Sequence, residues 1–152
     1  MLTTAQREFL NTNAPAGFPL QLGNILHHTT GCIKATYDFS VLGGAVGDIS
    51  LKTASGETAQ LPAGSFGVRS FVLVETAPTS AGSATIAFKS LSAADIYAAT
   101  AYGSVTGLLQ GKQDNLVANA LIAATATDIK ITIGTAALTA GKIHVYIEYL
   151  LK

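Results

Sequence analysis

The side chains best suited to metal binding or nucleophilic catalysis are one cysteine, Cys32, and three histidines, His27, His28 and His144. A metal site needs three or four ligands that converge on one point, whereas adjacent histidines on an extended chain point in opposite directions. A Cys–His nucleophile pair also needs an orienting group and an oxyanion hole, and the residues around Cys32 supply neither. We therefore interpret Cys32 as a small buried apolar residue at the start of the first strand, and we expect no metal and no cofactor.

A glycine-rich stretch, Gly107-Leu-Leu-Gln-Gly-Lys112, superficially resembles a phosphate-binding loop. It lacks the four-residue gap between glycines that such a loop has, and Gln113 stands where Ser or Thr would bind magnesium. We interpret Gly103, Gly107 and Gly111 as glycines of a turning loop, so this stretch does not indicate a nucleotide site.

The nine carboxylates are scattered along the chain, and none forms a close sequence pair suited to acid–base catalysis. Four of them fall on the polar faces of predicted strands: Asp38, Asp48, Asp128 and Glu148. Solvation or pairing across strands explains these four without catalysis. No set of residues meets the requirements of an active site, so we expect that the protein is not an enzyme.

The elements that would position these residues are mostly strands, because apolar and polar residues alternate with a period of two. The alternation is clearest at 143–149 and recurs at 35–41, 49–51, 84–88 and 129–133. These patterns place Tyr37, Phe39 and Tyr149 on inner faces, where we expect them to be core residues.

The stretch 68–75 differs from the other strands because both of its faces are apolar in the middle. Val72 lies on one face, and Phe71 and Leu73 lie on the other. This pattern predicts a central strand that is covered on both faces.

One internal helix is expected over Ser92–Ala101. Ser92 can cap it, and Asp95 three residues later completes a short capping box. Periodicity does not decide whether the apolar stretch 116–126 is a strand or a buried loop.

Short strands separated by Gly and Pro turns predict an all-β protein, an antiparallel, jelly-roll-like β-sandwich with one short helix and an extended N-terminal arm. The turn signals are Gly43-Gly44, Ser55-Gly56, Pro62-Ala-Gly64 and Ala140-Gly141. We expect an arm over 1–30 and a sandwich body over 31–152. The arm has a weak helix signal in 1–12, after which Pro15 and Pro19 hold the chain extended or turning.

The composition describes a chain with unusually little charge. Nine basic and nine acidic residues give a net charge of zero, and charged residues are 12% of the 152, about half the usual share of roughly 25%. No basic stripe for nucleic acid is present, and no stretch approaches the roughly 20 apolar residues of a membrane helix. Such a chain would be poorly soluble as a monomer, so we infer that partners cover much of its surface.

Several segments of the body are similar to small virion proteins of tailed phages. They are Ala35-Thr-Tyr-Asp-Phe-Ser-Val-Leu-Gly-Gly-Ala-Val-Gly-Asp-Ile-Ser-Leu51, Leu61-Pro-Ala-Gly64, Glu75-Thr-Ala-Pro-Thr-Ser-Ala-Gly-Ser-Ala-Thr-Ile-Ala87, Ser92-Ala-Ala-Asp-Ile96, Ala136-Ala-Leu-Thr-Ala-Gly-Lys142 and Val145-Tyr-Ile-Glu-Tyr149. The chain thus resembles the capsid decoration (cement) and head-fibre subunits of such phages. The resemblance implies a β-sandwich, homo-oligomers that are often trimers, a major capsid protein as partner, and a place on the outer surface of the virion after synthesis in the host cytoplasm.

Two functions follow from this resemblance. The first is a decoration protein that stabilises the head shell by bridging neighbouring major capsid proteins. The alternative is a head-fibre or tail-associated module that binds host surface glycans, with exposed tyrosines as stacking platforms. The candidate oligomer or partner contacts are Phe9, Leu10, Phe18, Leu20, Tyr97, Tyr102, Leu108, Leu109 and Tyr146.

Overall fold

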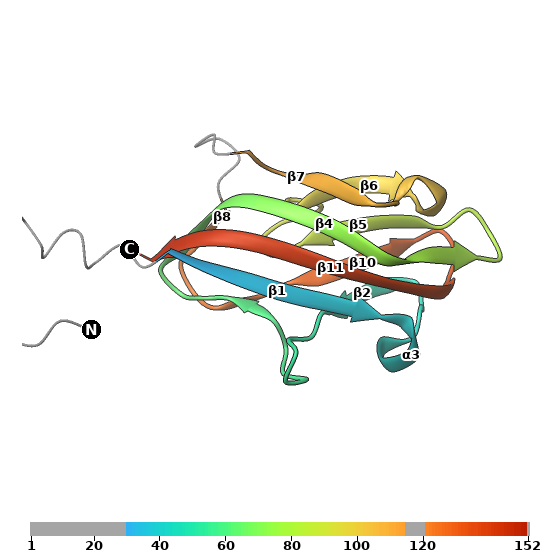
Figure 1. Cartoon of the computed structure of the whole chain (residues 1–152), viewed down its shortest axis with the longest axis horizontal. Helices are drawn as coiled ribbons and strands as arrows, with labels where there is room; N and C mark the ends of the chain where they lie inside the picture. Colours follow the sequence, from blue (N-terminus) through green and yellow to red (C-terminus); the bar gives the residue numbers. More distant parts are fainter. Residues whose placement is uncertain (1–29, 115–120, 152) are drawn as a thin grey trace, which may run out of the picture.

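The computed structural model describes residues 30–114 and 121–151 as two antiparallel sheets packed face to face (Figure 1). The five-stranded sheet runs β1 (Thr30–Asp38), β11 (Leu138–Leu151), β4 (Ser65–Ser80) and β7 (Leu108–Asp114), with β8 (Leu121–Ala123) also paired to β4. The four-stranded sheet runs β2 (Gly47–Ser50), β10 (Lys130–Gly134), β5 (Thr85–Lys89) and β6 (Tyr97–Ala101). A small third sheet joins β3 (Gln60–Leu61) to β9 (Thr127–Asp128). The predicted all-β antiparallel sandwich is confirmed.

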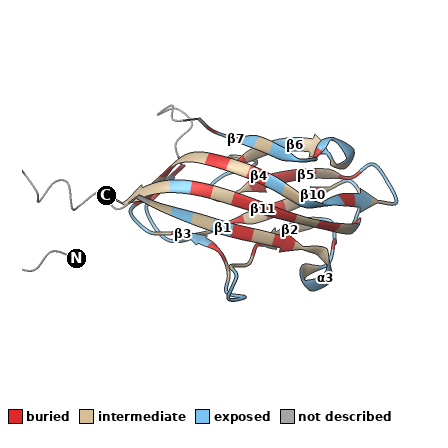
Figure 2. Ribbon diagram, viewed as in Figure 1, coloured by how far each residue is buried: buried red, intermediate tan, exposed pale blue. Residues whose placement is uncertain are grey.

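The core lies between the two sheets and is built by the alternation that the sequence shows. Buried and less buried residues alternate along the strands (Figure 2). The fully buried side chains from the five-stranded sheet include Tyr37, Val72 and Ile143. Those from the four-stranded sheet include Phe88 and Ile131.

Thr30 begins β1, and residues 1–29 of the predicted arm lie outside the described residues. So do Phe9, Leu10, Phe18 and Leu20, the helix signal in 1–12, and the two histidines that precede Cys32. The division into arm and body therefore stays a prediction.

The helix predicted over Ser92–Ala101 is wrong. The Asp95 carboxylate accepts hydrogen bonds from the N–H groups of Ser90, Leu91 and Ser92, at 2.8, 2.8 and 2.7 Å. It therefore closes a turn that precedes it, and the chain continues as β6, paired with β5. Pairing in the sheet overrides the helix preference of the alanines here.

The only short α-helix of the described residues is α3 (Phe39–Leu42), at a place where the sequence predicts continued strand. Asp38 ends β1 and caps this turn, because its carboxylate accepts a hydrogen bond from the Ser40 N–H at 2.9 Å. Phe39 therefore lies on α3, partly buried against the core, rather than on the inner face of the first strand.

One predicted turn and part of one predicted loop are strands instead. Ala140-Gly141 lies inside β11, where the pairing with β4 shifts register, and Gly141 has φ +136°. The predicted glycine loop contains a 3-10 turn, η1 (Tyr102–Ser104), and then β7. Gly111 of β7 is buried because the Ser70 side chain and the Ile96 carbonyl occupy the space of a side chain there.

Candidate interaction surface

The outer face of the five-stranded sheet carries large apolar side chains in register across its strands. On this face Tyr146 of β11 pairs with Phe71 of β4, and His144 pairs with Leu73. Leu73 also pairs with Leu108 of β7. One bulge between β11 and β4, at Glu148 and Tyr149, shifts the register between these rows and the next apolar row at the other end of the sheet.

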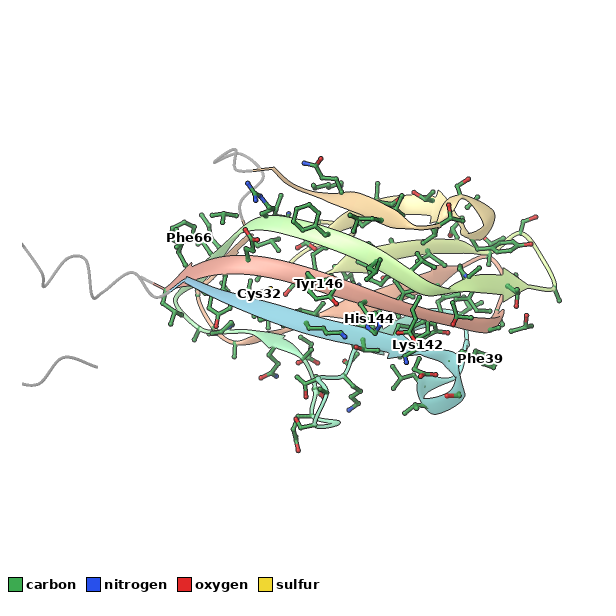
Figure 3. All side chains as sticks on the ribbon, viewed as in Figure 1. Cys32, Phe39, Phe66, Lys142, His144 and Tyr146 are labelled. Carbon is green, nitrogen blue, oxygen red and sulfur yellow. The ribbon has the colours of Figure 1, made fainter. Side chains whose placement is uncertain are left out.

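That next row contains Leu150 of β11, Phe66 of β4 and Ile122 of β8. Ile122 is 70% exposed and Leu108 is 68% exposed, so nothing in the described chain covers them. Figure 3 shows Phe66 near one end of β4, and Tyr146, His144 and Lys142 along β11. We call this set the apolar outer face: Phe66, Phe71, Leu73, Leu108, Ile122, Tyr146 and Leu150.

The outer face of the four-stranded sheet has the opposite character. Its side chains are small, polar or charged, and Lys89 Nζ lies 2.6 Å from Asp48 Oδ2. The Thr132 hydroxyl donates to the same carboxylate at 2.7 Å. These contacts lower the pKa of Asp48, with the hydrogen bond from Lys89 as the largest cause. The outer face of the four-stranded sheet is therefore polar, whereas that of the five-stranded sheet carries large apolar side chains beside its polar ones.

The four carboxylates predicted to be structural do make local or cross-strand contacts. Asp128 accepts hydrogen bonds from Gln60 Nε2 at 2.8 Å and Ser50 Oγ at 3.0 Å. Glu148 of β11 lies directly opposite Arg69 of β4, with their charged atoms 3.8 Å apart. Asp48 pairs with Lys89, and Asp38 caps α3, so each of the four carboxylates has a structural contact.

His144 connects three strands on this same outer face. Its side chain is only 7% exposed, and its Nε2 lies 2.7 Å from Glu75 Oε2 of β4. Its Nδ1 lies 3.0 Å from the Thr36 hydroxyl of β1. With Nε2–H donating to the carboxylate, Nδ1 of the neutral ring accepts from Thr36, so both nitrogens are satisfied. Sequence reasoning missed this contact, because Glu75 and His144 are far apart in the chain.

The hydrogen bond from His144 and a second one from Lys142, at 3.0 Å, lower the pKa of Glu75. The same contact with Glu75 raises the pKa of Lys142. The group is a charge-balanced polar bridge across the sheet. It stabilises the pairing of β1, β11 and β4.

A pocket of about 400 Å³ opens beside this bridge, between the end of β1, α3 and the turn at 52–56. Its lining includes Thr36, His144 and Lys34. A hydroxyl, an imidazole and a carboxylate in a row resemble a hydrolytic relay, but a relay also needs donors for an oxyanion. The Thr36 N–H is engaged with the Lys52 carbonyl at 2.7 Å and offers no such donor.

The structure corrects the prediction for Cys32. It does lie in β1, but its side chain is exposed on the outer face rather than buried. Partial burial raises the pKa of its thiol, and Glu148 opposite adds to the effect. Residues 30–114 and 121–151 contain no cluster of three or more His, Cys, Asp or Glu side chains placed to hold a metal ion. In those same ranges no helix has the length and apolarity that crossing a membrane requires.

The predicted contact residues that the structure describes do not gather in one place. Tyr146 and Leu108 lie on the apolar outer face, whereas Leu109 points inward and packs against the core. Tyr97 and Tyr102 are partly buried against the core, and the Tyr97 ring lies 6.4 Å from that of Phe88. The three tyrosines therefore form no shared stacking platform. Their role as partner contacts stays a prediction.

Comparison with known proteins places the fold among phage capsids. No protein-family model and no curated protein sequence match the chain. Among solved structures, it is similar to a chain in the acidic stable capsid of Helicobacter pylori bacteriophage KHP30, with a TM-score of 0.57 and 14% identity, over 82% of this chain and 90% of that chain. It is also similar to a chain in the capsid asymmetric unit of cyanophage Pam1, with a TM-score of 0.55 and 15% identity, over 91% of this chain and 92% of that one.

A third similar chain comes from the capsid of Ralstonia phage GP4, with a TM-score of 0.56 and 14% identity, over 82% of this chain and 84% of that chain. The high coverage on both sides means that all three matched chains are about as long as this one. The β-sandwich of this protein is thus a fold that occurs in phage capsids.

Proposed function

We propose that the protein is a structural protein of a phage virion, and specifically a capsid decoration (cement) protein that stabilises the head shell. The observation that carries the proposal is the apolar outer face, on a fold that recurs in chains of three phage capsids. Apolar patches on a protein surface often mark the places where partners bind.

The low charge of the chain supports the same proposal. Charged residues are 12% of the sequence and the net charge is zero. A subunit that bridges neighbouring capsid proteins must remove large parts of its surface from water. Each charged group that is buried there without a partner raises the free energy of the contact. Few ions and many small side chains favour close, flat contacts.

In this role the partners are other copies of the chain, in a homo-oligomer, and the major capsid protein. An oligomer that binds several shell subunits at once gains avidity without any single strong contact. The protein then lies on the outer surface of the capsid, is made in the host cytoplasm, and catalyses no reaction. The placement of the tyrosines gives no support to the alternative of glycan binding.

Mixing the purified protein with undecorated shells tests the proposal. We expect saturable binding at symmetry-related shell sites, seen by cryo-microscopy, and a higher melting temperature of the shell. When the concentration of free protein is 100 times its dissociation constant for the shell, binding stabilises the assembled state by about 2.7 kcal/mol per site. Density for the protein on the tail alone, with none on the shell, would contradict the proposal.

A further inference from the structure

We propose that the apolar outer face of the five-stranded sheet is covered by the same face of a second copy of this chain. The inference deepens the proposed function, and rests on it for the idea that the protein works as an assembled subunit. It assigns this surface to contacts between copies, and leaves other surfaces for the shell.

The first argument is that β4 has the sequence of a doubly covered strand but has only one cover. Val72 packs in the core, whereas Phe71 and Leu73 on its other face lie on an open surface of the described chain. Strands with apolar residues on both faces occur where both faces are packed. The missing cover must therefore come from outside the described sandwich.

The second argument is the size of the surface. Three strands at a spacing of about 4.8 Å, and the length from Phe66 to Leu73 at about 3.3 Å per residue, give a geometric area of about 330 Å². This area includes the row of Arg69 and Glu148 and is less than half of the roughly 800 Å² per partner of a standard interface, so the contact must also bury a polar rim. Lys34 and Gln110, paired to Tyr146 and Phe71 in the same row, supply such a rim.

The third argument is shape. A twisted sheet packs best on another twisted sheet of the same hand, about 10 Å away. The apolar outer face of a second copy is such a surface. The outer face of the four-stranded sheet is not, because it presents small, polar and charged side chains in place of large apolar ones.

The fourth argument is charge. A row containing Arg69 and Glu148 crosses the apolar outer face between its two apolar ends. A face that meets its own copy needs charges of both signs, because a face with one sign would repel itself. A symmetry axis through this row brings Arg69 of one copy toward Glu148 of the other. The zero net charge of the chain also removes overall repulsion between copies.

The test is the mass of the full chain in solution. We expect the wild-type protein to be an oligomer by size-exclusion chromatography with light scattering. The double variant Leu108→Asp, Ile122→Asp places two carboxylates on the face at positions that are 68% and 70% exposed, so the subunit should still fold. We expect this variant to be a monomer with the circular dichroism spectrum of the wild type. The dissociation constant of the contact between copies should rise at least about 100-fold.

Val46→Asp is the matched control. Val46 is also an exposed apolar residue, 57% exposed, but it lies in the connection between α3 and β2, away from the apolar outer face. This variant should keep the wild-type oligomeric mass. An oligomeric double variant, or a wild-type protein that is a monomer at micromolar concentration, would overturn the inference.

Cys32 gives an independent measurement, because it is the only cysteine of the chain and lies exposed on the same outer face. A nitroxide attached to it should give a defined distance between copies by pulsed electron resonance in the wild-type background, and none in the double variant. A distance that persists in the double variant would count against the inference.

Shell binding separates this inference from the proposed function. If the oligomer dissociates as expected but the wild-type protein does not bind shells, the contact between copies stands and the decoration role fails. If the protein binds shells but the double variant remains an oligomer, the decoration role stands and the inference fails.

Discussion

The carboxylate of Asp95 holds the turn between β5 and β6 of the four-stranded sheet, and its removal is a direct test of how this turn is stabilised. Three backbone N–H groups donate to it at 2.7–2.8 Å, from Ser90, Leu91 and Ser92. The Asp95 carbonyl also accepts a hydrogen bond from the buried Gln113 side chain at 2.7 Å, which connects the turn to β7. The turn thus links β5, β6 and β7.

The magnitude follows from which donors lose a partner in Asp95→Ala. A hydrogen bond to a charged group contributes about 1.5–3 kcal/mol. Leu91 and Ser92 are exposed, so their N–H groups can turn to water, whereas Ser90 is half-buried and cannot do so fully. We therefore expect a loss of about 2–3 kcal/mol in the free energy of unfolding, well below the sum of three bonds.

Urea denaturation followed by circular dichroism measures this loss, and a thermal melt should show a fall of about 5–10 °C. Glu57→Ala is the matched control. It removes the same charge from an exposed side chain that has no hydrogen bond or ion pair within the described part of the chain. Asp95→Asn keeps one acceptor oxygen and should lose about half as much stability. If Asp95→Ala were as stable as the control, the turn would be held by other contacts and the reasoning would be wrong.

Three further predictions follow from other contacts. Tyr37→Phe should lower the free energy of unfolding by about 1–2 kcal/mol, since the fully buried hydroxyl donates to the Gly43 carbonyl at 2.8 Å. Burial raises the pKa of Tyr37 from 10.0 to about 12, so wild-type stability should fall as the pH rises from 10 to 12, and Tyr37→Phe should lack this part of the fall in a pH series of urea melts. Contacts with His144 and Lys142 lower the pKa of Glu75 below its ordinary 4.5, so its contribution is present above that pH and lost in more acid solution. In Glu75→Gln the free energy of unfolding should therefore fall less steeply as the pH is lowered below 4.5. An unchanged fall would refute the role of the bridge. Gly111→Ala should cost about 2–3 kcal/mol, because a Cβ there would overlap the Ser70 hydroxyl and lie 2.9 Å from the Ile96 carbonyl oxygen. Gly103→Ala, which meets nothing within 4 Å, should leave the thermal melt almost unchanged.

Alternation of apolar and polar residues along the chain was enough to predict the sandwich and much of its core. Ile129, Ile131 and Ile133, spaced by two, are all buried in or beside β10. Ile143, Val145 and Ile147 are buried in β11 in the same way. The physical reason is local, because successive side chains of a strand point to opposite faces whatever the strand pairs with.

The helix at 92–101 shows where that reasoning ends. Ser92 and Asp95 are spaced as in a capping box, but the same spacing also suits a carboxylate that accepts hydrogen bonds from N–H groups before it. Local chemistry permits both, and the pairing of β6 with β5 selects the second. The same limit applies to Asp38, which ends β1 in a helical turn.

The sequence by itself determined the strand periodicity, the low charge, and the apolar character of both faces of β4. Only the tertiary structure decided that Phe71 and Leu73 join Tyr146, Leu108 and Ile122 on one open surface, because these residues come from four strands brought together by register. It likewise placed Glu75 against His144, and it left Cys32 exposed rather than buried. Periodicity is set by neighbours along the chain, whereas a surface is set by contacts between residues that are far apart in it.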